Sequence, residues 1–281
     1  MLLIKKHYFI GIILGSLFSQ VVWSNQVFRT EDLQGRITYS DKPAAGSIPV
    51  EISVSTNTHH RSLHQVASVY DGDTIVLKNG DRVRLLGINT PEIESRFRVD
   101  EPGGIAAKMW LKEQLENKKV YLEYDQEKLD RYKRLLAHLY LPSGKHLNAA
   151  LIEKGFAAVN IIPPNLRHTK KLIQAQQQAE KQALGIWSMP LYQPRPLTQI
   201  TRENKGWQRY IGKPESIKRN RKYSRLIFNE QTDVRIANDS LYLFPALESY
   251  LGKSIEIRGW VSRSKNKYSI LIHHPSALIL R

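Results

Sequence analysis

The chain has 281 residues, contains no cysteine and carries a formal net charge of +16 at pH 7. The lack of cysteine excludes disulfide bonds and thiolate metal sites, and the length allows one or two packed domains. The charge is uneven, because residues 189–281 hold 17 Lys and Arg against 7 Asp and Glu, a net +10. Such an excess favours nucleic acid as a partner, with an anionic membrane surface second and a merely soluble surface as the plainer alternative.

Residues 1–24 have the order of a secretory signal peptide. Two lysines precede an apolar run from Tyr8 to Phe18, and small residues follow, with cleavage expected after Ser24. The apolar run is too short to span a bilayer comfortably, so no stable membrane insertion is expected. The sequence therefore predicts an exported protein, either periplasmic or secreted.

Residues 25–47 alternate apolar and polar side chains around a Gln34-Gly35 turn, which predicts a small β accessory module built on a hairpin. The pattern resembles a module at the start of many exported bacterial proteins, and it implies no known chemistry. Residues 48–65 are expected to form a linker. The linker contains His59, His60 and His64, for which solvated side chains are a better interpretation than a metal site.

Residues 66–188 are predicted to form a mainly β domain with helices. Five β-rich runs are expected at residues 66–70, 74–77, 82–88, 120–124 and 134–140. An Asn79-Gly80 pair predicts a hairpin turn between the second and third runs. Helices are expected at residues 104–117, from a cap at Asn148 to Gly155, and at residues 169–184. This α+β pattern predicts a five-stranded barrel of the oligonucleotide/oligosaccharide-binding (OB) type with packed helices.

Residues 189–222 are predicted to form a basic linker, because they contain several prolines and a Lys/Arg run at residues 218–222. Further β-type runs follow at residues 224–228, 233–236, 241–244, 253–261 and 268–272. Residues 223–281 are therefore expected to form a second small, β-barrel-like domain that binds nucleic acid. Tyr242, Trp260 and Tyr268 lie among its basic residues, where they either stack on bases or fill the core of the domain.

Four motifs succeed one another in the middle of the chain. They are Tyr70-Asp71-Gly72-Asp73-Thr74, the run from Val83 to Glu92, Asp130-Arg131-Tyr132-Lys133-Arg134, and Leu184-Gly185-Ile186-Trp187-Ser188. Each motif is weak by itself. In this order, with strands and helices between them, they make residues 66–188 resemble the staphylococcal nuclease (thermonuclease-like) family.

Arg84 is the most informative single residue. It shares a strand face with Leu86 and Ile88, and a guanidinium there needs a partner because burying an unpaired charge is costly. The residues alone allow a buried ion pair or a phosphate clamp, and the accompanying motifs favour the clamp. The resemblance implies that Arg84 and Arg134 contact the scissile phosphate. It also implies that Glu92 is the general base or the carboxylate that orients water.

The resemblance further implies a bound Ca²⁺, with Asp73 and the backbone carbonyl of Thr90 as ligands. Asn89 stands where the family usually has a second liganding Asp. An Asn carbonyl can bind calcium but brings no charge, so weaker binding of the cation is expected. Asp71 either assists or caps its own turn.

Substrate contacts also depart from the family pattern. Tyr132 matches a family position that hydrogen-bonds phosphate, although an exposed aromatic without a role is an equal alternative. The family stacks the base on tyrosines near the segment that here spans residues 159–164, which contains none. A weak or altered base preference is therefore expected.

Together these features predict an exported, monomeric, metal-dependent endonuclease that hydrolyses phosphodiester bonds of DNA and RNA, without a protein partner. The main alternative is a non-catalytic nucleic-acid-binding protein that keeps the barrel. Asn89 favours that alternative, whereas the presence of Arg84, Glu92 and Arg134 opposes it. A third hypothesis, an envelope protein whose basic tail binds anionic lipid or glycan, leaves the catalytic set unexplained.

Overall fold

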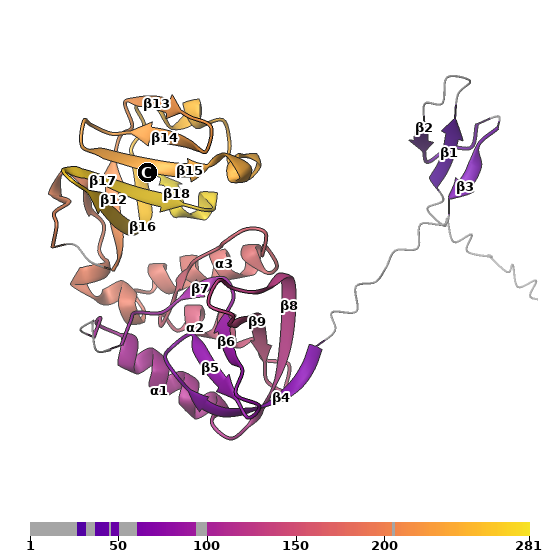
Figure 1. Cartoon of the computed structure of the whole chain (residues 1–281), viewed down its shortest axis with the longest axis horizontal. Helices are drawn as coiled ribbons and strands as arrows, with labels where there is room; N and C mark the ends of the chain where they lie inside the picture. Colours follow the sequence, from indigo (N-terminus) through magenta and orange to yellow (C-terminus); the bar gives the residue numbers. More distant parts are fainter. Residues whose placement is uncertain (1–26, 32–36, 45, 51–60, 94–99, 204–205) are drawn as a thin grey trace, which may run out of the picture. The chain divides into compact units, whose positions relative to one another are not determined.

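The computed structural model describes residues 27–31, 37–44, 46–50, 61–93, 100–203 and 206–281 (Figure 1). The chain divides into two compact units, residues 1–58 and 59–281. The predicted signal peptide lies outside the described residues. Within the described residues, no helix has the length and apolar character needed to cross a membrane.

The first unit contains a three-stranded antiparallel sheet in the order β2-β1-β3. Its strands are β1 (Val27–Glu31), β2 (Ile37–Ser40) and β3 (Ile48–Val50). Strands β1 and β2 pair with Arg29 opposite Tyr39, which confirms the predicted hairpin. Strand β3 pairs with the other edge of β1, so residues 48–50 extend the sheet rather than beginning a linker.

The second unit begins with a closed five-stranded barrel in the order β4-β5-β6-β9-β8. The strands are β4 (Arg61–Val69), β5 (Thr74–Leu77), β6 (Arg82–Leu85), β8 (Lys119–Leu129) and β9 (Leu135–Tyr140). The barrel confirms the predicted OB-type fold. Strand β4 starts earlier than expected, because residues 61–65, predicted as linker, pair with β8 from Arg61 opposite Glu123 onward.

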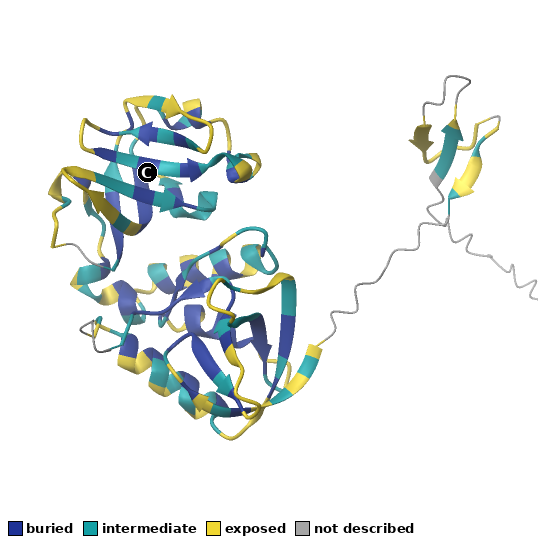
Figure 2. Ribbon diagram, in the orientation of Figure 1, coloured by how far each residue is buried: buried dark blue, intermediate teal, exposed yellow. Residues whose placement is uncertain are grey.

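Helices pack around this barrel, and their buried faces are dark blue in Figure 2. They are α1 (Gly104–Leu115), α2 (Leu147–Glu153) and α3 (Thr169–Lys181), with a short pair of strands, β7 (Ile88–Asn89) and β10 (Ala158–Val159). The predicted apolar face of α1 is confirmed, since Ala107, Leu111 and Leu115 are fully buried. Helix α3 ends before the predicted position, at Lys181, and Ala183 beyond it is exposed with a positive φ of 50°.

Asn148 does not cap α2 as predicted, because the helix begins one residue earlier. Its side chain is fully buried and bridges two other segments. Oδ1 accepts a hydrogen bond from the Leu139 backbone N–H at 2.9 Å, and Nδ2 donates to the Leu86 carbonyl at 2.8 Å. Asn148 therefore ties α2 to β9 and to the turn after β6.

The rest of the second unit is one eight-stranded β-sheet in the order β11-β12-β16-β17-β15-β14-β13, with β18 paired to β16. Its strands are β11 (Arg195–Pro196), β12 (Trp207–Gly212), β13 (Ser216–Arg219), β14 (Tyr223–Ile227), β15 (Thr232–Ala237), β16 (Ile255–Ser264), β17 (Lys267–Ile272) and β18 (Leu278–Leu280). Two short 3₁₀ helices precede the sheet, η1 (Gly185–Ser188) and η2 (Pro190–Tyr192). Four more lie between its strands: η3 (Leu197–Gln199), η4 (Asn238–Leu243), η5 (Leu247–Tyr250) and η6 (Pro275–Ala277).

Two predictions for this C-terminal sheet were wrong in detail, although the predicted β domain is confirmed. Residues 189–222 are not a linker, because β12 and β13 lie within them. The linker prediction rested on the prolines and the basic run of this stretch. It missed the strand because Trp207 and Tyr210 of β12 are buried through tertiary contacts. Residues 241–244 overlap η4 rather than forming a strand.

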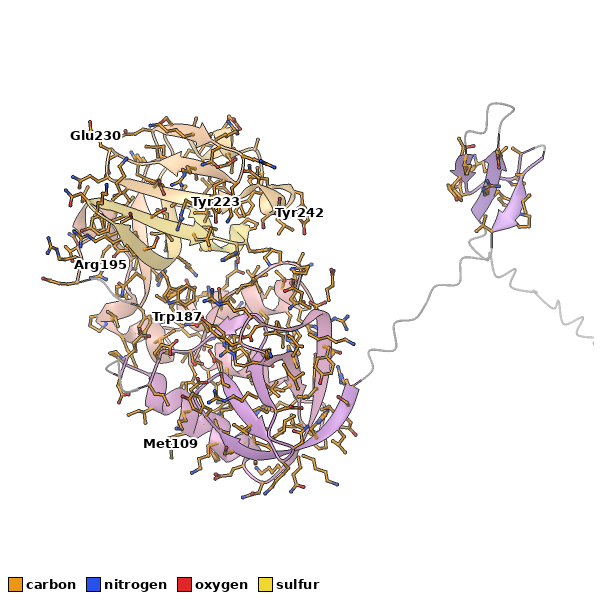
Figure 3. All side chains as sticks on the ribbon, in the orientation of Figure 1. Met109, Trp187, Arg195, Tyr223, Glu230 and Tyr242 are labelled. Atoms are coloured by element: carbon orange, nitrogen blue, oxygen red, sulfur yellow. The ribbon has the colours of Figure 1, made fainter. Side chains whose placement is uncertain are left out.

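The aromatic residues predicted either to stack on bases or to fill the core do not fill it. Tyr242 is 71% exposed and Trp260 is 38% exposed, while Tyr268 is half-buried. Figure 3 labels Tyr242, which lies in η4. The core is formed instead by buried apolar side chains such as Tyr210 and Ile257.

The barrel part and the C-terminal sheet are joined by a small apolar cluster. Trp187 of η1 packs edge-on against Trp207 of β12, with ring centroids 6.1 Å apart. Tyr192 of η2 and Ala179 of α3 belong to the same buried cluster. The last family-like motif is therefore covered by the sheet that follows it.

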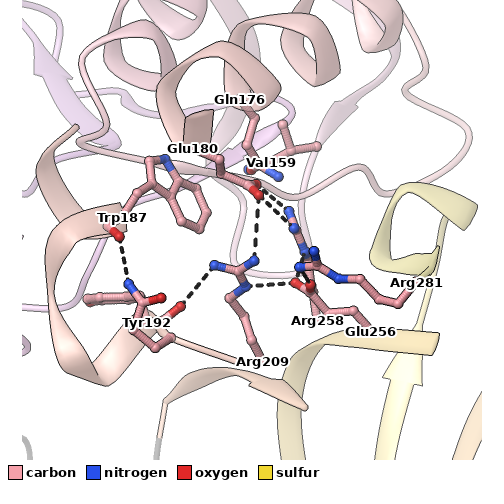
Figure 4. A network of polar contacts seen from close by, with 10 residues as sticks. Val159, Gln176, Glu180, Trp187, Tyr192, Arg209, Glu256, Arg258 and Arg281 are labelled. Atoms are coloured by element: carbon pink, nitrogen blue, oxygen red, sulfur yellow. Dashed lines mark hydrogen bonds and ion pairs between the residues drawn. The ribbon is translucent and has the colours of Figure 1, made fainter. Parts of the chain in front are cut away.

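A buried network of ion pairs lies beside this cluster (Figure 4). The guanidinium of Arg258 donates to both carboxylate oxygens of Glu180 on α3, at 2.5 and 2.8 Å. The carboxylate of Glu256 accepts from Nε of Arg209 at 2.7 Å and from Nε of Arg258 at 2.6 Å, and it also pairs with Arg281. A buried carboxylate with such partners is stabilised, whereas removing one partner leaves an uncompensated charge.

Glu256 gives this network a defined pH dependence. Burial alone raises the pKa of Glu256, but the hydrogen bonds and charges of Arg209, Arg258 and Arg281 outweigh it and lower the pKa to about 2, from an ordinary 4.5. Because the folded pKa is depressed, the stabilisation is present above pH 4.5 and is lost as the pH falls toward 2. A shift of this size corresponds to about 3 kcal/mol of folding free energy.

We therefore expect Glu256→Gln to lower the free energy of unfolding at pH 7, with a deficit that shrinks between pH 5 and pH 2. Urea unfolding at several pH values measures this. Glu248→Gln is the matched control, because Glu248 pairs with Arg219 on the exposed surface and should give nearly the wild-type curve. A deficit for Glu256→Gln that is the same at pH 3 and pH 7 would contradict the assignment.

Candidate active site

The turn between β4 and β5 presents two carboxylates at one end of the barrel. Asp71 Oδ1 accepts the backbone N–H of Asp73 at 3.0 Å, so Asp71 does cap its own turn. Gly72 between them has no room for a side chain, since an added Cβ would lie 2.7 Å from atoms of Thr90 and Ala107. The turn is thereby pressed against β7 and α1, which fixes the position of Asp73.

Asp73 is buried and forms the centre of a polar cluster. Its Oδ2 atom pairs with Nη2 of Arg84 at 2.8 Å and accepts the backbone N–H of Thr90 at 3.0 Å. Arg84 lies on β6, in register with Thr74 on β5. The sequence analysis kept a buried ion pair as one of two interpretations of Arg84. The structure contains such a pair, between Arg84 and Asp73.

Asn89 and Thr90 complete this cluster at the end of β7. Arg84 Nη2 donates to Oδ1 of Asn89 at 3.3 Å, and Asn89 Nδ2 donates to the Thr90 carbonyl at 3.1 Å. The structure thus brings together four of the residues predicted from sequence: Asp73, Arg84, Asn89 and Thr90. Three of them are buried and Arg84 is half-buried, which limits competition from water.

Arg134 lies in a second cluster, at the turn between β8 and β9. The β6 and β9 strands are parallel, and Arg84 is in register with Leu136. Arg134 is two residues before Leu136 and one residue before β9 begins, so it lies about 7 Å from the level of Arg84 along the barrel. This pairing brings the two predicted phosphate-binding arginines to one region of the barrel.

Asp130 holds Arg134 in place, a role that sequence reasoning did not assign. Its Oδ2 atom pairs with Nε and Nη2 of Arg134, both at 2.7 Å, and its Oδ1 atom accepts the backbone N–H groups of Tyr132 and Arg134. Burial alone raises the pKa of Asp130, but these donors outweigh it and hold the pKa below its usual value. The signal was available, since Asp130 opens the Asp-Arg-Tyr-Lys-Arg motif.

Tyr132 and Glu92 are the remaining residues predicted for the site. Tyr132 is 64% exposed, its hydroxyl accepts from Arg131 Nη2 at 2.7 Å, and its ring lies 5.5 Å from the Arg134 guanidinium. Glu92 is half-buried three residues after β7, and its backbone N–H donates to Glu101 Oε2 at 3.0 Å. Residues 94–99, which follow, lie outside the described part of the chain.

The oxygen donors of the first cluster suit a hard cation. Asp73, the Thr90 carbonyl, the Asn89 amide and nearby Asp71 offer only oxygen ligands, as calcium prefers. No group of three or more His, Asp or Glu with metal-site geometry occurs among the described residues. That result is compatible with this donor set, because an amide and a backbone carbonyl contribute half of it.

The electrostatics of the paired carboxylates point the same way. Burial, followed by the charge of Asp73, raises the pKa of Asp71 to about 7. Repulsion between two neighbouring carboxylates in a partly buried turn would be relieved by the positive charge of a divalent cation. As a ligand, Asn89 would turn its amide so that the oxygen, not Nδ2, faces the Thr90 side of the cluster.

Comparison with known proteins identifies the family. The family described as staphylococcal nuclease homologue matches residues 82–189. The thermonuclease of Staphylococcus intermedius is 41% identical over 125 residues, which is 43% of this chain and 74% of that protein. The thermonuclease of Staphylococcus hyicus is 36% identical over 140 residues, or 48% of this chain and 82% of that protein.

The chain belongs to the staphylococcal nuclease family. A further relative, the SPbeta prophage-derived endonuclease YokF of Bacillus subtilis, is 37% identical over 123 residues, which is 42% of this chain and 41% of that protein. The family match ends at Met189, just after η1. The eight-stranded sheet therefore lies outside the part of the chain that matches the nuclease family.

The predicted catalytic set gives the first test of the site. Arg84→Ala, Glu92→Gln and Arg134→Ala should each lower nuclease turnover by at least about 10²-fold, the usual scale for losing one preorganised transition-state contact. Initial rates on plasmid DNA measure the loss, and circular dichroism checks the fold. Near-full activity of any one variant would refute the role given to that residue.

Two controls separate chemistry from folding. Arg131→Ala removes an exposed arginine from the same turn as Arg134 and should retain most of the turnover. Arg84→Ala leaves buried Asp73 without its charged partner, so it should also lower the melting temperature. Arg84→Lys keeps a positive charge beside Asp73 but lacks the planar fork, so it should recover stability more than turnover.

Proposed function

We propose that this protein is an exported, calcium-dependent endonuclease that cleaves DNA and RNA. Its family membership makes it a nuclease that hydrolyses phosphodiester bonds. The observation that best supports the finer proposal is the cluster of Asp73, Arg84, Asn89 and Thr90, with Arg134 just before β9, the strand that pairs with β6. The cluster combines an oxygen-rich cation site with two guanidinium groups, which is the chemistry that phosphodiester hydrolysis needs.

In the proposed mechanism the protein's own residues orient the phosphate and the water. Arg84 and Arg134 donate to the non-bridging oxygens and stabilise the charge that develops on them. Glu92 accepts the proton of the attacking water as the water oxygen bonds to phosphorus. The bond from phosphorus to the leaving oxygen breaks, and that oxygen takes a proton from solvent.

The cation would be held by Asp73, Asn89 and the Thr90 carbonyl, with Asp71 nearby. When bound, it supplies positive charge beside the scissile phosphate. Asp130 acts as a positioning residue, because its two bonds to the Arg134 guanidinium fix the direction of that side chain. The closed barrel provides the rigid frame for these groups.

One observation favours the non-catalytic alternative. Asn89 brings no charge, and its amide donates to the carbonyl of Thr90, another proposed ligand. A barrel that binds nucleic acid without cleaving it would tolerate such a site. The decisive assay incubates purified mature protein with plasmid DNA, and separately with RNA, in calcium and in chelator. Cleavage in calcium only supports the enzyme, and binding without cleavage in either condition supports the alternative.

Export follows from the sequence of residues 1–24, which lies outside the described residues. Fractionation of cells that express the full chain tests it. Protein recovered in the periplasm or medium, with an N-terminus at Asn25, supports the proposal. Full-length protein confined to the cytoplasm would contradict it.

Asn89 also yields a quantitative prediction about calcium. Asn89→Asp adds a negative charge next to the cation, where Coulomb attraction exceeds about 1 kcal/mol even under strong screening. Half-maximal activity of the wild type should therefore need about fivefold more calcium than that of the variant. A calcium titration of initial rates measures both values.

Asn79→Asp is the matched control for this titration. Asn79 lies in the exposed turn between β5 and β6, so the same substitution there adds the same charge away from the site. Its calcium requirement should equal that of the wild type. If Asn89→Asp leaves the requirement unchanged or increases it, Asn89 is not a cation ligand.

A further inference from the structure

One face of the C-terminal sheet carries a row of cations across three neighbouring strands. Lys218 of β13 is in register with Arg225 of β14, and Arg225 is in register with Arg235 of β15. Alternate residues of β15 are buried, so Arg235 and its partners point away from the core. We refer to Lys218, Arg225 and Arg235 as the cationic row.

Such a row is unfavourable for the sheet by itself, because like charges directly opposite each other destabilise paired strands. Asp233 offsets part of the charge through its ion pair with Arg225, at 2.6 Å. Arg235 Nη2 donates to the neutral hydroxyl of Ser262 at 3.1 Å. Its Nε atom is buried and has no hydrogen-bond partner among the described residues. Glu215 and Glu230 line the same hollow as Lys218 and Arg225, so the least compensated charge of the row is that of Arg235.

Aromatic rings accompany the cationic row. The ring of Tyr223 on β14 lies 5.5 Å from the Arg235 guanidinium and 6.0 Å from that of Arg225. Arg235 is in register with Leu271 of β17, and both line one cleft with Trp260 of β16, which is 38% exposed. Cations that follow a backbone, interleaved with rings on which bases stack, are the arrangement that binds single-stranded nucleic acid.

The same face ends in a cleft of about 300 Å³ between the sheet and the barrel part. Arg235 and Trp260 line it from the sheet, and Asn160 and Ile162 line it from the barrel part. This volume lies at the small end of the range for small-molecule pockets, which suits one nucleotide unit. The cleft therefore joins a charged surface to the nuclease family domain.

The barrel wall of the cleft is continuous with the candidate active site. The backbone N–H of Asn160 donates to the Gly87 carbonyl at 2.9 Å. Two residues earlier, Ala158 of β10 is in register with Asn89 of β7. Paired residues lie within about 5.5 Å between Cα atoms, so this wall begins next to a proposed cation ligand.

We propose that single-stranded nucleic acid binds along the cationic row and Tyr223, inserts a base against Trp260, and passes through the cleft toward the candidate active site. The proposal rests on the proposed function only in taking the bound polymer to be the substrate. A single strand is the occupant, because its bases have free faces for stacking, whereas a duplex keeps those faces paired within its own stack.

The test measures binding without turnover. Fluorescence anisotropy with a labelled single-stranded oligonucleotide of about twenty nucleotides, enough to span several ring and cation sites, is performed on the full chain in chelator. The Arg225→Gln/Arg235→Gln double variant should weaken binding and make the slope of log affinity against log salt shallower by about 1.4, at roughly 0.7 per lost phosphate contact. Lys253→Gln, in the exposed turn before β16, removes a cation outside the row and should bind nearly as the wild type does.

Trp260 is tested separately. Trp260→Ala should weaken binding about fivefold or more, the scale of one lost base stack, and Trp260→Phe should restore most of it. Equal weakening by both substitutions would show a packing role and overturn the stacking assignment. If the Arg225→Gln/Arg235→Gln variant keeps the wild-type salt slope, the cationic row does not contact the phosphates and the proposal is wrong.

The remaining outcomes distinguish other partners and the proposed function. Equal affinity for duplex DNA, lost in the same variants, would overturn the single-strand assignment. Binding to vesicles with anionic lipid, without binding to oligonucleotide, would make the face a membrane surface. Because these measurements need no cleavage, a protein that binds in this way but fails to cut DNA refutes the proposed function and leaves this inference standing.

Discussion

The ion pair between Asp73 and Arg84 is the contact on which the candidate site depends. Both groups lie at a barrel end where water has little access, so each charge needs the other, and removing one partner of such a pair typically costs about 3–5 kcal/mol. Asp73 also accepts the backbone N–H of Thr90, and Arg84 donates to Asn89. One pair therefore sets the relative positions of β5, β6 and β7. The same interaction that stabilises the barrel end keeps a guanidinium and several oxygen donors where a phosphate and a cation would meet.

A second set of charges connects this domain to the sheet that follows it. Glu180 on α3 and Glu256 on β16 share the guanidinium groups of Arg209 and Arg258. Buried, hydrogen-bonded ion pairs impose strict geometry, because misplacing one partner leaves a charge unsatisfied. The network therefore holds the sheet in a defined position against the barrel part. Together with the apolar cluster around Trp187 and Trp207, this restraint fixes the shape of the cleft between the two parts. A surface on the sheet can then deliver substrate to a site on the barrel.

Sequence reasoning predicted the barrel, its helices and the four clustered site residues, because period-two strands and short motifs are local signals. It failed where tertiary contacts override local composition. The stretch containing β12 looks like a linker from its prolines and charges, yet Trp207 is buried against Trp187 of the preceding part. Asn148 is a residue type that often caps helices, but its side-chain amide instead forms hydrogen bonds with two distant backbone groups. Asp130 opens a motif that the sequence analysis recognised, but its contacts with Arg134 depend on how a tight turn folds. The cationic row depends on strand register across two consecutive hairpins, which the sequence does not specify.

The most direct measurement is a crystal structure of the full chain grown with calcium and a short oligonucleotide that resists hydrolysis. We expect a cation about 2.3–2.6 Å from oxygens of Asp73 and Thr90. We also expect a phosphate within about 3 Å of the guanidinium nitrogens of Arg84 and Arg134. A phosphate bound away from both arginines, or a cation bound elsewhere with Asp73 still paired only to Arg84, would contradict the proposed site.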